Sequence, residues 1–307
     1  MASASPTGDR LVTGIALRVG AACTYALMSA ALKLASERGG VVPFEMLFYR
    51  ALFGMMVVLA WVTSRGPGLG ALITQRPLAH VGRSALGIVS ILMTFQAIIL
   101  LPLELAITIG FTAPIFATLL SALLLGERVG PRRWAAVVIG FCGIIVATRP
   151  GSASLPLAGV AVAIAAALGQ GSVTITLRHL GKTENPAAIV FWFFVCSAVV
   201  GLVALPFTGH RHDWGTYGLL AAGGLCGGVM QLLMTASLRH APVSAVAPFD
   251  YLQIVWAIAL GWLLWSEAPA WTTLAGAALI AGSGLYTAWR ERQLSLNQTV
   301  AAPVPVE

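Results

Sequence analysis

The chain has 307 residues, of which 58% are hydrophobic and only 9% are charged, with a formal net charge of +7. Soluble domains usually carry roughly 25% charged residues, so this composition excludes a water-soluble globular protein. The basic residues lie in short connectors between apolar runs, and no aromatic-basic pattern typical of RNA binding is present, which argues against a nucleic-acid partner.

The N-terminal segment, residues 1–10, is short and polar, and we expect it to lie in the cytoplasm. The apolar run that follows reaches about residue 34, which is long for the hydrophobic region of a signal peptide, and no convincing cleavage site follows it. We therefore expect an uncleaved first span.

Ten apolar runs are long enough to cross a membrane, since a bilayer core needs roughly 20 residues of helix. Backbone groups in lipid must be hydrogen-bonded within their own segment, so these runs should be helices. The predicted fold class is an all-α integral membrane protein with ten transmembrane helices. The predicted spans are 11–34, 43–63, 82–100, 103–125, 131–148, 156–178, 187–206, 215–238, 243–266 and 271–289.

The connectors indicate the orientation. With the N-terminus inside, twelve basic residues fall on the cytoplasmic side and four on the outer side, which satisfies the positive-inside rule. Both termini should therefore be cytoplasmic, and residues 291–307 should form a disordered tail because they are polar and then rich in Ala and Pro. The cytoplasmic set is Arg10, Arg65, Arg76, Arg83, Arg128, Arg132, Arg133, Arg178, Lys182, Arg239, Arg290 and Arg292.

The two halves of the chain resemble each other. Pro102 and Pro242 open the fourth and ninth spans, and Glu127 and Glu267 follow the same spans, both pairs at an offset of 140 residues. Each half contains five predicted spans, and an odd number makes the second copy enter the membrane from the opposite side. Such an inverted repeat is a recurring plan of secondary transporters. The two repeats are predicted to cover residues 11–150 and 151–290.

Three segments resemble the EamA family of the drug/metabolite transporter superfamily. They are Pro43–Arg50 (PFEMLFYR), Thr112–Phe116 (TAPIF) with Gly126 and Glu127, and Ala247–Tyr251 (APFDY) followed by Glu267. The resemblance implies ten helices as two inverted repeats around a central cavity. It also implies transport of amino acids, nucleotides, vitamins or related metabolites. One departure is Phe193, which stands where the repeat alignment would place a partner of Arg50.

Two charged residues occupy similar depths on the first and ninth spans. Arg18 and Asp250 each lie seven residues from the predicted cytoplasmic end of a span, and charges inside a membrane should face protein or water. We expect them to form a gating or anchoring ion pair. The alternative is that Arg18 reaches the interface while Asp250 binds backbone freed by Pro248.

Arg50 lies seven residues past Pro43, about 10 Å into the second span. It could contact an anion such as a substrate carboxylate, or form a structural salt bridge for which Glu45 and Glu104 are the obvious partners. Pro114 and Pro248 lie in equivalent spans and should kink them, because proline removes a backbone hydrogen bond.

Uncharged polar residues inside the spans are candidates for hydrogen bonds to a polar solute, although polar contacts between helices explain them equally well. Together with Arg18, Arg50 and Asp250, the cavity and gating candidates are Tyr25, Thr94, Gln96, Gln170, Gln231 and Tyr251. Four glycines of the eighth span, Gly223, Gly224, Gly227 and Gly228, should allow close helix packing within one molecule.

No catalytic residue, metal site or cofactor is predicted, since the cysteines and histidines lack ligand spacing and no Walker, HExxH or GxSxG motif is present. We therefore expect a monomeric secondary transporter in a bacterial inner membrane that exports an amino acid or related metabolite. The alternative is uptake of a vitamin or nucleotide-like solute such as riboflavin or S-adenosylmethionine, and an intramembrane enzyme or a channel is more remote. Asp250 is the candidate if transport is coupled to protons.

Overall fold

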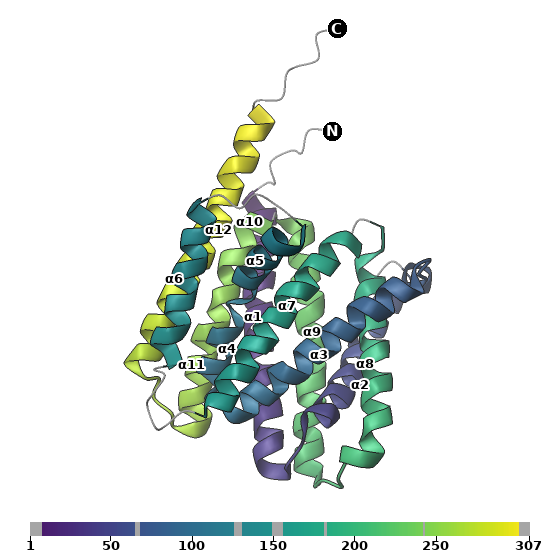
Figure 1. The fold of residues 1–307 in the computed structure, drawn as a ribbon. Helices are drawn as coiled ribbons and strands as arrows, with labels where there is room; N and C mark the ends of the chain where they lie inside the picture. Colours follow the sequence, from purple (N-terminus) through teal and green to yellow (C-terminus); the bar gives the residue numbers. More distant parts are fainter. Residues whose placement is uncertain are drawn as a thin grey trace.

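The computed structural model describes residues 8–64, 68–125, 131–148, 156–180, 183–241 and 243–300, and throughout these ranges the regular structure is helical (Figure 1). The all-α prediction is therefore confirmed. The first half contains α1 (Gly8–Gly39), α2 (Pro43–Ser64), η1 (Leu69–Leu72), α3 (Pro77–Leu100), α4 (Leu103–Gly110), α5 (Ala113–Leu125) and α6 (Pro131–Thr148). The second half contains α7 (Leu157–Leu180), α8 (Pro186–Thr208), α9 (Trp214–His240), α10 (Val243–Val246), η2 (Ala247–Tyr251), α11 (Leu252–Trp265) and α12 (Trp271–Val300).

Eight helical segments among the described residues are long and apolar enough to cross a membrane. They cover the predicted first to fourth and sixth to ninth spans. Helices α6 and α12 occupy the other two predicted spans, but the apolar part of α6, Trp134–Thr148, is shorter than the usual crossing length. The chain is thus a multi-pass helical membrane protein, while a total of ten crossings remains a prediction.

Local sequence signals explain where several helices begin. Proline is the first residue of α2, α3, α6 and α8, a position where its missing N–H has no helical partner to lose. The side chain of Asn185 accepts a 2.9 Å hydrogen bond from the amide of Ala187 at the start of α8. At the start of α9, Asp213 accepts a 2.8 Å hydrogen bond from the amide of Gly215. These caps satisfy amide groups that the helix itself leaves free.

The predicted fourth and ninth spans are interrupted rather than merely kinked. Helix α4 ends at Gly110, and α5 restarts at Ala113 with Pro114 in its first turn. In the ninth span a 3₁₀ segment containing Pro248 separates α10 from α11. A proline lacks the amide proton of the helical ladder and clashes with the preceding turn, which explains a break at both places.

Helix α12 continues to Val300 and extends beyond the bundle (Figure 1). The prediction that the whole segment 291–307 is disordered is therefore wrong for residues 291–300, while residues 301–307 lie outside the described part of the chain. The helix persists because this stretch contains Glu, Arg, Gln and Leu, which are good helix formers, and reaches no proline before Pro303.

The main helix pairs join the first half of the chain to the second. Helix α1 packs most extensively on α9, α3 on α7, α6 on α12, and α2 on both α8 and α9. The start of α1 and the end of α12 lie at the same end of the bundle (Figure 1). The core is therefore formed between the halves, and any internal cavity must lie between them.

The glycines of α9 lie in close contact with α1 and α2, in line with the prediction of close helix packing. A Cβ atom on Gly223 would lie 2.9 Å from Leu32 of α1, and one on Gly228 would lie 2.9 Å from the Cα atom of Gly54 in α2. A Cβ atom on Gly224 would lie 2.7 Å from the carbonyl oxygen of Tyr49. Such distances require a hydrogen atom in place of a side chain, so the glycines set the spacing between α9 and its neighbours.

We expect Gly224→Ala to destabilise the protein by about 1–3 kcal/mol, because the added methyl group would press on the backbone of α2. The matched control is Gly218→Ala on the same helix, where nothing lies within 4 Å of the new Cβ atom. That control should be neutral or slightly stabilising, since alanine favours helix over glycine. Thermal unfolding of the purified variants measures both effects, and equal melting temperatures would contradict the prediction.

Candidate functional site

A cavity of about 340 Å³ lies between the two halves of the bundle. Its walls come from α1, α2, α3 and α4 of the first half and from α7, α8, α9 and α11 of the second. The lining is mainly apolar with a few polar groups, which is the usual character of a small-molecule site, and the volume suits a small organic solute.

Five of the predicted polar candidates line this cavity. The five residues come from α1, α2, α3, α7 and α9, which lie far apart in the sequence. They are Tyr25, Arg50, Thr94, Gln170 and Gln231. The Thr94 hydroxyl donates a 2.9 Å hydrogen bond to the carbonyl oxygen of Ser90, so its remaining capacity is chiefly as an acceptor.

Four of the predicted candidates do not line the cavity: Gln96, Tyr251, and the pair Arg18 and Asp250. Gln96 is two residues beyond Thr94, and a helix turns by roughly 200° over that distance, so the two side chains face different ways. Tyr251 instead packs with Phe111, at a distance of 4.8 Å between the ring centroids. Phe111 lines the cavity, and Tyr251 supports it at the place where the breaks in the fourth and ninth spans meet.

Arg50 is buried, with 4% of its surface exposed, and its Nε and Nη1 atoms have no hydrogen-bond partner among the described residues. The structural alternative, a salt bridge from Arg50 to Glu45 or Glu104, does not form among the described residues. Glu45 accepts hydrogen bonds from the amides of Val42 and His210, and it pairs with His212 at 2.9 Å. Five residues separate Glu45 from Arg50, which corresponds to roughly 140° around the helix, so they point to different faces.

Arg83 is a cavity residue that the sequence analysis assigned to the cytoplasmic connectors. Helix α3 begins at Pro77, ahead of the predicted span, which places Arg83 about 9 Å inside the helix. Its Nε and Nη1 atoms, like those of Arg50, are buried without a hydrogen-bond partner in the described structure. Recognising that Pro77 starts the helix would have placed Arg83 inside α3 and made it a candidate cavity residue.

Phe193 of α8 joins the two arginines. The Cζ atom of Arg83 lies 4.4 Å from the centroid of the Phe193 ring, and the Cζ atom of Arg50 lies 6.0 Å from the same centroid. The ring face is electronegative and attracts both cations. A Cβ atom on Gly87 would lie 2.9 Å from the Phe193 ring, so the absence of a side chain at Gly87 makes room for it.

Arg18 and Asp250 form the ion pair that the sequence suggested. The Nε and Nη2 atoms of Arg18 donate to the two carboxylate oxygens of Asp250, each at 2.5 Å. This two-point geometry is the strong form of an arginine–carboxylate contact. Asp250 lies in η2, two residues after Pro248, so the pair connects α1 to the interrupted ninth span.

A second carboxylate–histidine contact lies elsewhere in the bundle. The Nε2 atom of His80, near the start of α3, lies 3.3 Å from a carboxylate oxygen of Glu184, which precedes α8. Both side chains are almost fully buried. Desolvation raises the pKa of the Glu184 carboxyl, but the neighbouring His80 ring and Thr74 hydroxyl outweigh it, and the net pKa lies below its ordinary value.

We expect Glu184→Gln to lower the melting temperature at neutral pH, because it removes the charged partner of His80. A carboxyl with a lowered pKa contributes stability above its ordinary pKa and loses that contribution as the pH falls through the lowered value. The difference in melting temperature between wild type and variant should therefore shrink below the ordinary carboxyl range. Thermal unfolding between pH 7 and pH 3 measures it, and a pH-independent difference would contradict the assignment.

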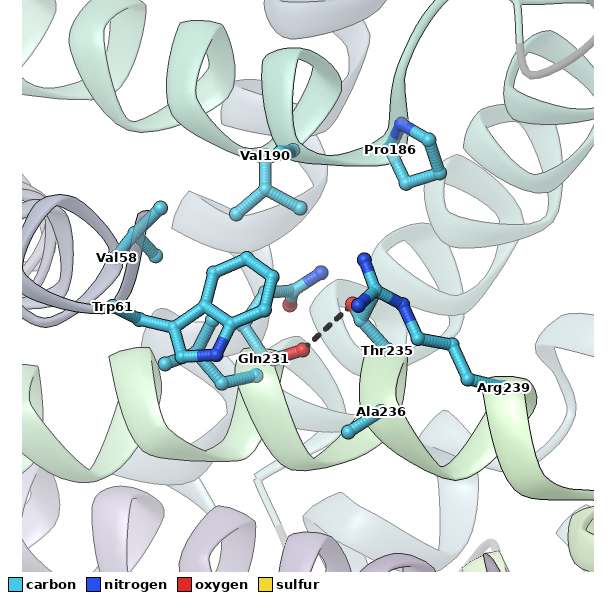
Figure 2. Close-up of a pocket in the computed structure, with 10 residues that line it drawn as sticks. Val58, Trp61, Pro186, Val190, Gln231, Thr235, Ala236 and Arg239 are labelled. Atoms are coloured by element: carbon cyan, nitrogen blue, oxygen red, sulfur yellow. Dashed lines mark hydrogen bonds between the residues drawn. The ribbon is translucent and has the colours of Figure 1, made fainter. Parts of the chain in front are cut away.

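A much smaller cavity, of about 30 Å³, lies among α2, α8 and α9. Figure 2 shows Trp61, Val190 and Arg239 pointing toward its interior, and the Cζ atom of Arg239 lies 5.4 Å from the Trp61 ring centroid. Val190 and Gln231 line both this cavity and the large one. The small cavity therefore continues the large one toward the end of α9.

No group of three or more His, Cys, Asp or Glu side chains within the described ranges is arranged to hold a metal ion. The chemistry of the site consists of hydrogen bonding, two cationic groups and apolar contact. A solute-sized cavity inside a bundle of membrane-crossing helices defines the class of protein as a small-molecule membrane transporter.

The chain belongs to the EamA-like transporter family, because the model of that family matches residues 12–149 and matches again at residues 157–288. A riboflavin transporter from Rhizobium johnstonii is 33% identical over 220 residues, which are 71% of this chain and 72% of the relative. The pseudopaline exporter of Pseudomonas aeruginosa is 29% identical over 279 residues, 89% of this chain and 94% of the relative.

An S-adenosylmethionine uptake transporter from Rickettsia felis is 24% identical and covers 81% of this chain and 84% of its own. A solved structure with 22% identity matches with a TM-score of 0.62 over 88% of this chain and 96% of its own, which shows a shared fold. The three named relatives are transporters of small molecules rather than enzymes, and this chain is a multi-pass transporter of a small-molecule substrate.

Proposed function

We propose that this protein is a secondary transporter that exports an amino acid or a related small metabolite by alternating access. The observation that carries the proposal is the 340 Å³ cavity enclosed between the two halves, with polar groups at Tyr25, Arg50, Gln170 and Gln231 inside an apolar wall. The sequence has no Walker motif, so a solute or ion gradient supplies the energy.

The packing supports the proposed inverted repeat. In the proposed repeat, α1 is equivalent to α7 and α3 is equivalent to α9. Exchanging the two halves therefore converts the α1–α9 pair into the α7–α3 pair. The same exchange leaves the α2–α8 and α6–α12 pairs unchanged, and all four pairs are among the most extensive contacts. The double match to one family model supports the same duplication. Two related halves of opposite sense can interchange conformations, which is how alternating access arises.

The two carboxylate–histidine contacts also fit this plan. Glu45 near the start of α2 pairs with His212 ahead of α9, and Glu184 ahead of α8 approaches His80 near the start of α3. Helices α2 and α8, like α3 and α9, are equivalents in the proposed repeat. We infer that the contacts hold opposite ends of the bundle and that each is broken when its end opens.

The ion pair between Arg18 and Asp250 is proposed to gate or anchor the end of the bundle where α1 begins. It connects α1 to the interrupted ninth span, whose η2 segment lacks a regular helical ladder and can rearrange. If transport is coupled to protons, Asp250 is the proposed site of protonation, since protonation would release Arg18. The small cavity at Trp61 and Arg239 is the proposed route toward the same face.

Export is favoured by the pseudopaline exporter, which covers 89% of this chain. The second candidate is uptake of a vitamin or nucleotide-like solute, favoured by the relatives named as a riboflavin transporter and an S-adenosylmethionine uptake transporter. We place the protein in a bacterial inner membrane as a monomer with both termini in the cytoplasm, where most of its basic connector residues would lie.

The test is flux across liposomes that contain the purified protein. A carrier gives saturable uptake of labelled amino acids, and unlabelled solute inside the liposomes accelerates entry by counterflow. Riboflavin, S-adenosylmethionine and nucleosides form the second panel and decide between the two candidates. Flux that neither saturates nor shows counterflow would overturn the carrier mechanism.

A further inference from the structure

The cavity is lined by two cations, the buried Arg50 and the half-buried Arg83, that share one aromatic ring. The guanidinium groups of Arg50 and Arg83 both lie over Phe193, and the Nε and Nη1 atoms of each are buried without a hydrogen-bond partner in the described structure. Two described carboxylates contact histidines instead of these arginines, Glu45 with His212 and Glu184 with His80.

The lining of the cavity has two positive groups and, within the described residues, no aspartate or glutamate. An isolated charge in a low-dielectric interior costs several kcal/mol unless an opposite charge or hydrogen bonds compensate it. The contacts with Phe193, and for Arg50 a further contact at 5.4 Å with the Phe194 ring, compensate only part of this cost, since a cation over an aromatic ring gains roughly 0.5–2 kcal/mol. Each of the two guanidinium groups therefore lacks a negatively charged partner in the described cavity lining.

We propose that Arg50, Phe193 and Arg83 form a binding site for a solute that carries two carboxylate groups. Each guanidinium presents paired N–H donors that match the two oxygens of one carboxylate. The Phe193 ring lies between these donors as an apolar surface against which the carbon chain joining the carboxylates packs. This assignment names the substrate class of the proposed transporter and rests on that function.

The neutral side chains complete the selectivity. Tyr25, Gln170 and Gln231 line the same cavity and can hydrogen-bond other polar groups of the solute without adding charge. A solute with a single carboxylate would leave one guanidinium uncompensated, and a neutral solute would leave both. The affinity of the site should therefore increase with the number of carboxylate groups on the solute.

The experiment uses the full-length protein in nanodiscs at pH 7 and three matched sets of ligands. The first set is the linear dicarboxylates from malonate to adipate, the second their monomethyl esters, and the third their diamides. Binding is measured by ligand-induced thermal shift and by calorimetry. At least one dicarboxylate should bind about 10- to 100-fold more tightly than its monoester, because one charge-assisted contact is lost.

The variants Arg50→Gln and Arg83→Gln should each reduce the dicarboxylate affinity about 10- to 100-fold and leave the affinity of the diamide unchanged. If Arg50→Gln folds poorly, Arg50→Lys replaces it as the test. This variant retains the charge and should keep part of the preference for the dicarboxylate over its monoester and diamide. The control is Arg76→Gln, which removes an exposed arginine just before α3 and should change nothing. Inorganic phosphate serves as a further probe, and tighter binding of phosphate than of every dicarboxylate overturns the two-carboxylate assignment.

The outcomes separate this assignment from the carrier function. Failure of every dicarboxylate to bind more tightly than its ester and diamide overturns the site, whether or not amino acids are transported. Arginine-dependent dicarboxylate binding without counterflow retains the site and overturns the carrier.

Discussion

Replacing Asp250 with Ala should abolish transport and destabilise the protein by about 3 kcal/mol. The substitution leaves Arg18, which is 5% exposed, without the carboxylate that binds both Nε and Nη2. Breaking a buried ion pair from one side is costly because the remaining charge stays desolvated. Arg18→Ala should impair transport similarly, since Asp250 then loses its partner.

A double-mutant cycle provides the decisive measurement. If the two side chains act as a pair, the double variant Arg18→Ala with Asp250→Ala loses less stability than the two single variants added together. The exchange of the charges, Arg18→Asp with Asp250→Arg, should restore part of the flux in liposomes. Additive losses in the cycle, with no recovery on exchange, would show that the two residues act independently.

The second large effect is expected at Arg50, where function and stability should change in opposite directions. Arg50→Gln should reduce flux about 10- to 100-fold, the cost of one charge-assisted contact to the solute. The melting temperature of the solute-free protein should stay unchanged or rise, because the variant removes an uncompensated buried charge. Binding sites commonly retain such destabilising groups because the ligand needs them.

Parallel flux and melting measurements on Arg50→Gln, Arg50→Lys and Arg76→Gln test this expectation. Arg50→Lys should keep part of the flux, and Arg76→Gln should keep all of it. A large fall in the melting temperature of solute-free Arg50→Gln would instead show that the arginine holds the helices together. A structural role for Arg50 would then be the better description.

The sequence predicted the features that depend on local pattern. Apolar length identified the helices, prolines identified the breaks near Pro114 and Pro248, and small residues identified the close face of α9. The pairing of Arg18 with Asp250 was also predictable, because both depths could be counted from the ends of their spans. Each of these inferences uses spacing along one helix or matched distances from a membrane face.

The cavity could be predicted only in part, because its walls come from helices of both halves. Gln96 seemed equivalent to Gln231 by repeat position, but rotation about α3 turns it away from the lining. Arg83 was assigned to a connector because hydropathy alone does not locate the start of α3. The shared contact with Phe193 joins α2, α3 and α8, and no local pattern encodes such a meeting.

The close packing of α9 against α2 limits how the molecule can move. At Gly228 the backbones of the two helices are close enough that a single methyl group would not fit beside Gly54. If α2 and α9 slid past each other, Val57 and Phe53 would clash with the glycines of α9. The two helices must therefore move together as one rigid unit. This pair takes one helix from each half of the sequence, so its close packing opposes any motion in which the two halves separate as rigid bodies.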